Sequence, residues 1–312
     1  MSPRQEAPAS LVGPHLVLAV MGPTASGKTQ LAAGLCRELG GDMVNADSRQ
    51  AIAELEVGVC KPTSAELRGV VCHGLDWAHL GEPFSAGRYR QLAASTIGDL
   101  QDLGRIPVVV GGTGLYVRAL LDGFDFGGVP PGKERPTLPA ENPEVLAELT
   151  RLDPERAAAI DISNPRRLVR AVELARAGTR ASRAAPRWRS LRLGCRIGPD
   201  QLRRRVEERS DRLMGEPLAA EVRSLVARGY PPALVASAAI GYAEAVDWVA
   251  GRCSRREAAE RLAARTWRYA RAQMTWLRSE PSVVWIDAGT GLEEMVSAGV
   301  SAVGLACGQG LP

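Results

Sequence analysis

The sequence predicts an α/β fold, in which a parallel sheet is flanked by helices and carries an inserted small helical lobe. Short apolar runs alternate with helical patterns, and this alternation favours parallel strands covered on both faces. A glycine-rich loop, Gly22-Pro-Thr-Ala-Ser-Gly-Lys-Thr29, lies directly between the apolar run 15–21 and the helical pattern 30–39. It matches G-x-x-x-x-G-K-[ST], and its place between a strand and a helix predicts a P-loop NTPase-like sheet.

Each further element follows from its own pattern. Four more apolar runs are expected to be strands of the same sheet, at residues 42–46, 106–110, 191–197 and 282–286. Helical periodicity marks residues 88–103, 143–152, 164–177, 200–228 and 255–278. We expect two of these strands to end in polar or glycine-rich turns, at Asp47–Gln50 and Gly111–Gly114.

The order of these patterns predicts a discontinuous core. We assign it to residues 14–126 and 190–290, with an inserted basic helical lobe at 127–189 and tails at 1–13 and 291–312. The composition changes at 127–136, where glycine and proline are frequent, and the linker 181–186 precedes the strand that returns to the core.

Composition narrows the class of protein. The chain has 312 residues and a formal net charge of +4, and no stretch approaches the length of a membrane span. The N-terminus lacks the basic start and apolar segment of a secretory signal. The cysteines are scattered without a Cys-x-x-Cys pair, and three histidines are too few to suggest a zinc site. We therefore expect a cytoplasmic, monomeric protein with reduced thiols and no membrane contact.

Positive charge is concentrated in one part of the chain. Between Ile162 and Arg205 there are thirteen arginines against two acids, Glu173 and Asp200. Such a run can be a solvated helix face. We favour the other interpretation, a surface that contacts nucleic-acid phosphates.

The glycine-rich loop predicts an anion site. Its backbone N–H groups can surround phosphate oxygens at the N-terminus of a helix, where the helix dipole favours negative charge. Lys28 adds a point charge, and Thr29 offers a hydroxyl ligand for Mg²⁺. The residues expected to bind a di- or triphosphate are Gly22, Pro23, Thr24, Ala25, Ser26, Gly27, Lys28 and Thr29.

The two other turns should lie beside this loop, because ligands bind at the carboxyl ends of strands in open α/β sheets. Asp47 can be a magnesium ligand, a general base or the N-cap of the next helix, and site chemistry alone leaves the first two roles equal. Ser48 and Gln50 offer hydrogen bonds that suit a base or amide edge. Gly111 and Gly112, followed by Thr113, allow close backbone approach and add one hydroxyl, although a tight turn alone would also explain them.

Several blocks together resemble one family. The chain is similar to the tRNA dimethylallyltransferase (tRNA isopentenyltransferase) family in the order and spacing of eight motifs over about residues 15–287. They are the P-loop 22–29, Asp47–Gln50, Gly58–Pro62, Glu82–Ser85, Gly111–Tyr116, Asn164–Glu173, Ile240–Tyr242 and Gln273–Arg278. The resemblance implies transfer of a dimethylallyl group from dimethylallyl diphosphate to the exocyclic amine of an adenosine. In tRNA this is the adenosine just 3′ of the anticodon, and pyrophosphate is released.

The resemblance also implies roles for residues. The P-loop would bind the diphosphate rather than ATP, with Mg²⁺ held by Thr29 and Asp47, and the catalytic residues would be Asp47 as base, Lys28 and Thr113. The residues expected to contact the acceptor are Ser48, Gln50, Gly111, Gly112, Thr113, Arg166, Arg167, Arg170, Arg268 and Gln273.

The chain departs from the family pattern at some positions. Ala238, Trp267 and Ala272 stand where the family has arginine, Ile52 stands where it has an aromatic residue, and the segment 123–151 is short. A prenyltransferase of the same fold acting on a nucleotide, an indole or another small acceptor therefore stays an alternative. A P-loop kinase is a second one, although no arginine-rich lid is evident. We favour tRNA because a run of thirteen arginines suits an RNA backbone.

Overall fold

The computed structural model describes residues 16–128 and 143–309. The predicted tail 1–13, most of the glycine- and proline-rich segment 127–136 and the last three residues lie outside these ranges. In the part of the chain that is described, no helix is long and apolar enough to cross a membrane.

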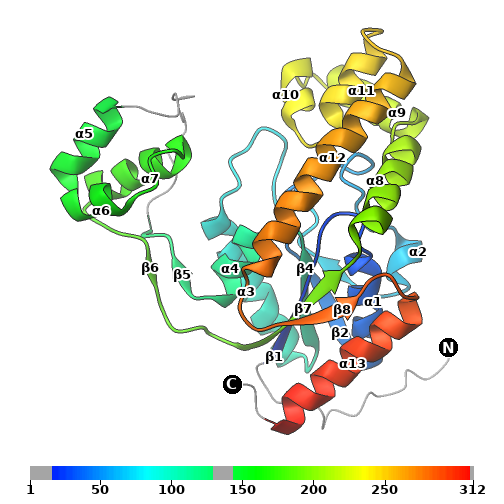
Figure 1. Ribbon diagram of the computed structural model, residues 1–312, viewed down its shortest axis with the longest axis horizontal. Helices are drawn as coiled ribbons and strands as arrows, with labels where there is room; N and C mark the ends of the chain where they lie inside the picture. The colour runs from blue at the N-terminus through cyan, green and yellow to red at the C-terminus, as the bar shows by residue number, and fades with distance from the viewer. Residues whose placement is uncertain (1–15, 129–142, 310–312) are drawn as a thin grey trace.

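A six-stranded parallel sheet forms the centre of the molecule (Figure 1), which confirms the predicted fold class. Its strand order is β3 (Cys72–His73), β2 (Gly41–Asn45), β4 (Ile106–Gly111), β1 (Leu16–Met21), β7 (Arg189–Arg196) and β8 (Val283–Asp287). β1 is fully buried and pairs with β4 on one side and β7 on the other. The sequence did not reveal β3, because two residues carry no readable alternation.

Helices cover both faces of the sheet, as continuous apolar strands require. Leu16, Leu18 and Val20 of β1 face one layer, while Val17 and Ala19 face the other. The first layer contains α1 (Lys28–Leu39), α13 (Leu292–Gln309) and part of α8 (Pro199–Leu213), and the second contains α3 (Ala86–Asp102) and α4 (Gly114–Leu121). The short helix α2 (Ser64–Leu67) contacts α1.

Five helices share a separate apolar core beyond the carboxyl edge of the sheet (Figure 1). They are α8, α9 (Glu216–Ala227), α10 (Pro232–Ser237), α11 (Tyr242–Val249) and α12 (Arg255–Arg278). We call them the helical unit. The predicted helical stretch 200–228 is two helices, α8 and α9, separated at Met214 and Gly215. α12 begins in the helical unit, where Leu262 is buried, and ends against the sheet, where Leu277 is buried.

The lobe consists of α5 (Pro143–Leu152), α6 (Pro154–Ala159) and α7 (Pro165–Arg176). Figure 1 shows these helices at one end of the molecule, away from the main sheet. They share a small apolar core that includes Leu149 and Leu168. A two-stranded antiparallel ribbon, β5 (Phe124–Asp125) and β6 (Ser182–Arg183), connects the lobe to the rest of the chain. β6 lies within the segment that the sequence indicated as a linker.

The C-terminal segment is a structural element of the sheet layer. α13 packs against α1, where Gly299 lies close to Leu35 and Gly34 lies close to Val296. The sequence interpretation assigned 291–312 to a tail, because its glycine and alanine content shows no clear periodicity. Small residues on both helices allow the close approach that the structure shows.

Candidate active site

The P-loop joins β1 to α1, and two of its residues have left-handed backbone conformations. Ala25 and Gly27 have φ angles of 63° and 86°, and the Ser26 N–H donates to the Pro23 carbonyl at 3.3 Å. Consecutive turns of this kind direct backbone N–H groups into one concave surface at the start of a helix. A methyl group on Gly22 would lie 2.6 Å from the Ser26 hydroxyl, so the loop depends on glycine at this position. The predicted anion loop therefore has the backbone shape that its chemistry requires.

Lys28 lies in the first turn of α1, where its Nζ donates to the Pro23 carbonyl at 3.3 Å. Burial lowers the pKa of Lys28, the negative charge of Asp47 raises it, and the positive charge of Arg209 lowers it. A negatively charged ligand beside Lys28 would favour the ionised form that burial disfavours.

Asp47 follows β2 at the sheet edge. Asn45 fixes the turn, since its Oδ1 accepts from the Asp47 N–H at 2.9 Å and its Nδ2 donates to the Asp47 carbonyl at 3.0 Å. The Oδ1 of Asp47 accepts from the Arg49 N–H at 2.9 Å. Asp47 therefore caps its own turn, and its half-exposed carboxylate also lines the cavity described below.

The turn after β4 lies directly against the Asp47 turn. The Thr113 hydroxyl accepts from the Ser48 N–H at 3.2 Å, and the Thr113 N–H donates to the Ala46 carbonyl at 3.3 Å. A methyl group on Gly111 would overlap the Ala46 backbone. Glycine at this position is thus a requirement of the close approach between the two turns.

Gln273, on α12, connects the P-loop to the turn Gly111–Gly114 that follows β4. Its Oε1 accepts from the Thr24 N–H at 2.9 Å, and its Nε2 donates to the Gly112 carbonyl at 3.0 Å. The side chain is buried. The sequence interpretation placed Gln273 among the acceptor contacts. In the structure its amide holds two loops together, and direct contact with an acceptor stays a prediction.

These turns surround a cavity of about 470 Å³. One wall comes from the sheet edge and is polar, with Thr24, Asp47, Ser48 and Thr113. The helical unit and the adjoining loop supply apolar residues to the lining, namely Val59, Leu213, Ala236, Ala239, Ile240 and Leu262. The remaining lining residues are Arg49, Gly58, Cys60, Arg209, Ser210, Ser237, Arg265, Thr266 and Tyr269. The arrangement can hold a ligand that has a charged end and an apolar end.

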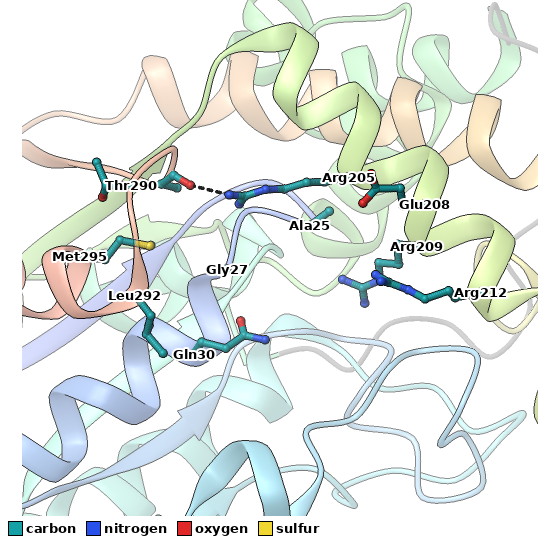
Figure 2. Close-up of a pocket in the computed structure, with 11 residues that line it drawn as sticks. Ala25, Gly27, Gln30, Arg205, Glu208, Arg209, Arg212, Thr290, Leu292 and Met295 are labelled. Carbon is teal, nitrogen blue, oxygen red and sulfur yellow. Dashed lines mark hydrogen bonds between the residues drawn. The ribbon is translucent and has the colours of Figure 1, made fainter.

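A second cavity of about 360 Å³ also lies against the P-loop (Figure 2). Arg205, Arg209 and Arg212 of α8 line it together with Ala25 and Gly27 of the P-loop. Arg205 donates to the Ala288 carbonyl at 2.9 Å, and Arg209 also lines the first cavity. The sequence interpretation missed Arg209 and Arg212. Their spacing from Arg205 by four and seven residues puts all three on one helix face, and this signal could have been read.

Other predicted residues lie outside the first cavity. The Gln50 Nε2 donates to the Val59 and Cys60 carbonyls at 3.2 Å and 3.0 Å, and Arg268 is exposed on α12. Arg166, Arg167 and Arg170 are on α7 in the lobe, far along the molecule from the P-loop (Figure 1). The structure therefore does not bring these arginines together with the sheet edge.

The positions that depart from the family pattern have different surroundings. Ala238 is buried in the helical unit and Ile52 packs against the same core. Trp267 is half-buried and stacks with Arg203 at 5.9 Å, whereas Ala272 is exposed. Arg209 and Arg265 supply positive charge to the cavity from other positions.

The residues present fit a Mg²⁺ ion that binds together with a phosphate ligand. The described residues contain no group of three side chains able to hold a metal ion alone. Mg²⁺ commonly takes one or two protein oxygens and completes its shell with water and substrate phosphates. Thr29, in the first turn of α1, and Asp47, whose charge acts on the neighbouring Lys28, offer such oxygens.

Comparison with known proteins decides the family. Residues 50–280 match the model of the IPP transferase family. The chain belongs to this family. The resemblance predicted from the sequence is confirmed, and the chain is an enzyme of the prenyltransferase class.

Similar proteins cover almost the whole chain. A tRNA dimethylallyltransferase 1 from Pelobacter propionicus is 39% identical over 292 residues, which cover 89% of this chain and 94% of the relative. A tRNA dimethylallyltransferase from Thermomicrobium roseum is 40% identical over 285 residues, covering 87% of this chain and 86% of the relative. The crystal structure of a tRNA isopentenylpyrophosphate transferase from Bacillus halodurans superposes with a TM-score of 0.68 at 29% identity, covering 93% of this chain and 97% of that one.

Proposed function

We propose that this IPP transferase family member moves a dimethylallyl group from dimethylallyl diphosphate to the exocyclic amine of an adenosine in tRNA, and releases pyrophosphate. The observation that carries the proposal is a cavity whose lining combines polar residues of the sheet edge, among them Asp47 and the P-loop residue Thr24, with several apolar residues of the helical unit. An allylic diphosphate likewise has a charged end and an apolar end.

The reaction breaks the bond between the allylic carbon and the diphosphate oxygen and forms a bond from that carbon to the adenine nitrogen. The adenine amine is a poor nucleophile, because its lone pair is delocalised into the ring. Asp47 would accept the proton that the nitrogen loses, which is the role of a general base. Its place in the polar wall of the cavity supports this assignment.

The leaving pyrophosphate carries the negative charge that develops in the transition state. We expect the P-loop N–H groups, Lys28 and Arg209 to stabilise it, and the positions of Arg209 in the cavity lining and close enough to Lys28 to act on its charge support this. Thr29 and Asp47 would hold Mg²⁺, which neutralises phosphate charge when it is bound. Arg209 would thus be a charge-stabilising residue that the sequence interpretation did not include.

The acceptor is proposed as tRNA because the relatives are named tRNA dimethylallyltransferases and because the segment 127–189, predicted as the inserted lobe, has more basic than acidic residues. A base in an RNA loop must leave its stack to enter a cavity of this kind. A cytoplasmic location and a monomeric state stay predictions from the sequence.

The test is incubation of the protein with dimethylallyl diphosphate and Mg²⁺ in the presence of tRNA or of a panel of small acceptors, including adenosine monophosphate and indole. We expect mass spectrometry to find one added dimethylallyl group on an adenosine of the tRNA. Modification of a small acceptor with unmodified tRNA would replace this proposal with the small-molecule alternative. Phosphate transfer from ATP would favour a kinase.

A further inference from the structure

The loop Glu56–Cys60 forms part of the cavity wall. The carboxylate of Glu221, which does not line the cavity, binds this loop through hydrogen bonds. Oε2 of Glu221, on α9, accepts from the Glu56 N–H at 3.1 Å and from the Val57 N–H at 2.6 Å. The Gly58 N–H is 3.5 Å from Oε1 of the same carboxylate. Three consecutive backbone donors thus converge on one charged side chain, an arrangement stronger than neutral hydrogen bonds.

Tyr242, the first residue of α11, completes this contact. Its hydroxyl donates to Oε1 of Glu221, and its ring is fully buried against Gly58. A methyl group on Gly58 would overlap the Tyr242 ring, so the loop can approach the helical unit only with glycine at this position. Burial and the nearby Glu221 carboxylate raise the pKa of Tyr242, which keeps the hydroxyl a donor.

The same loop holds the catalytic turn from its other side. The carbonyls of Val59 and Cys60 accept both hydrogen bonds from the Gln50 amide. The Gln50 backbone N–H in turn lies 3.5 Å from Asp47 Oδ1. A continuous series of contacts therefore leads from the helical unit through the loop and Gln50 to Asp47.

We propose that Glu221 and Tyr242 are positioning residues for the transfer reaction, which hold the Asp47 turn in place through the loop Glu56–Cys60 and Gln50. The inference rests on the proposed function, since Glu221 and Tyr242 would act by orienting Asp47 as the general base. Orientation of a reacting group affects the rate strongly. A reacting group displaced by about 1 Å can lose on the order of a hundredfold in rate.

The first experiment compares Glu221→Gln with Glu216→Gln in transfer from dimethylallyl diphosphate to tRNA. Glu216 lies on the same helix, is exposed and pairs with Arg223, so it is a matched control for the charge change. An amide at 221 presents an NH₂ group toward backbone donors. We expect kcat to fall about 10- to 100-fold for Glu221→Gln, and this loss should exceed any change in the KM for the diphosphate because the P-loop is untouched. Activity equal to that of Glu216→Gln would overturn the inference.

A double variant tests the route through Gln50. If Glu221 acts through the loop and Gln50, Glu221→Gln combined with Gln50→Ala should lose no more activity than the more damaging single change. Losses that multiply would mean that Glu221 acts on the reaction by another route, and would contradict the proposal.

Amide hydrogen exchange gives a readout that does not depend on activity. In Glu221→Gln we expect faster exchange at residues 56–58 and also at 47–50, with the rest of α9 unchanged. Tyr242→Phe keeps the ring against Gly58 and removes one donor, so it should produce a smaller change of the same pattern, and it decides the matter if Glu221→Gln does not fold. Unchanged exchange at 47–50 would overturn the inference. If wild-type protein modified no acceptor while this pattern held, the proposed function would fail and the positioning of the turn would stand.

Discussion

The P-loop edge of the sheet and the inserted lobe 127–189 both contain several arginines, but they use them differently. Around the P-loop, Arg209 and Arg212 of α8 line a cavity beside the anion loop. In the lobe, Arg176 pairs with Glu148 at 2.7 Å, and Arg180 pairs with Asp153 and Glu155 at 2.6 Å and 3.0 Å. Charge at the sheet edge is therefore available to a ligand, whereas much of the charge in the lobe is already matched by the lobe's own acids.

This difference shows what a count of charges omits. The run 162–205 contains thirteen arginines, but the fold distributes them among several environments. Arg192 is half-buried in the main body, where it pairs with Asp122 and with Glu280. Such an arginine holds elements together and contributes nothing to an RNA surface.

The largest effect should come from the sheet edge itself. Lys28→Ala removes the P-loop charge, and we expect no detectable transfer. Pyrophosphate at about a hundred times its Kd should stabilise wild-type protein by about 2.7 kcal/mol, and this gain should disappear in the variant. Thermal unfolding with pyrophosphate measures it, and ATP at equal concentration should protect wild-type protein less. Full protection of the variant would show that the loop is not the diphosphate site.

Asp47→Asn should have the next largest effect. The amide keeps the shape of the turn but cannot accept a proton, so the rate should fall on the order of a hundredfold or more, while diphosphate affinity changes little. Single-turnover kinetics and pyrophosphate titration separate the two quantities. A collapse of diphosphate binding would instead indicate that Asp47 acts chiefly on the metal.

Arg209→Ala tests whether the α8 charge is available to the ligand. Because Arg209 lines both cavities and its charge acts on Lys28, we expect a loss of about 100-fold in transfer, at the lower end of the range for one removed transition-state donor. Arg204→Ala is the matched control, since Arg204 is an exposed residue of the same helix that lines neither cavity. Equal activity of the two variants would remove Arg209 from the site.

Replacing arginines of the lobe should have the smallest effect, and it should appear only in the salt dependence of acceptor binding. If tRNA is the acceptor, each phosphate contact in a single-stranded region contributes about −0.7 to the log–log slope of binding against salt. Arg166 is exposed, whereas Arg170 already pairs with Glu173 at 2.8 Å. Replacing Arg166, Arg167 and Arg170 with alanine should flatten the slope by about 0.7 to 2.1 units and leave diphosphate affinity unchanged. Acceptor binding that does not weaken between low and physiological salt would favour a small acceptor.

Local patterns predicted much of this molecule. The alternation of apolar runs and helices predicted five of the strands of the sheet, and the P-loop pattern predicted a loop of the right shape between β1 and α1. The family pattern predicted that the Asp47 turn and the Gly111–Gly114 turn belong to the site. Asp47, Ser48 and Thr113 line the cavity, and Gly111 packs against the backbone of the Asp47 turn.

The remaining features depend on contacts between distant parts of the chain. Gln273 reaches Thr24 across 249 positions, and Glu221 reaches Val57 across 164. No local pattern states that a buried amide will join two loops or that a carboxylate will collect backbone donors. The partners of Arg192 are 88 and 70 positions away in sequence. Such roles become visible only when folding brings the partners together.

The ribbon of β5 and β6 has a consequence for how this protein can change over evolutionary time. The lobe has its own apolar core around Leu149 and Leu168, and it joins the main body through two strands of two residues each. Insertions or deletions within it disturb few contacts of the sheet. We expect the lobe to have diverged in length and composition among relatives faster than the catalytic edge, so that selection on RNA recognition could act there while the chemistry stayed unchanged.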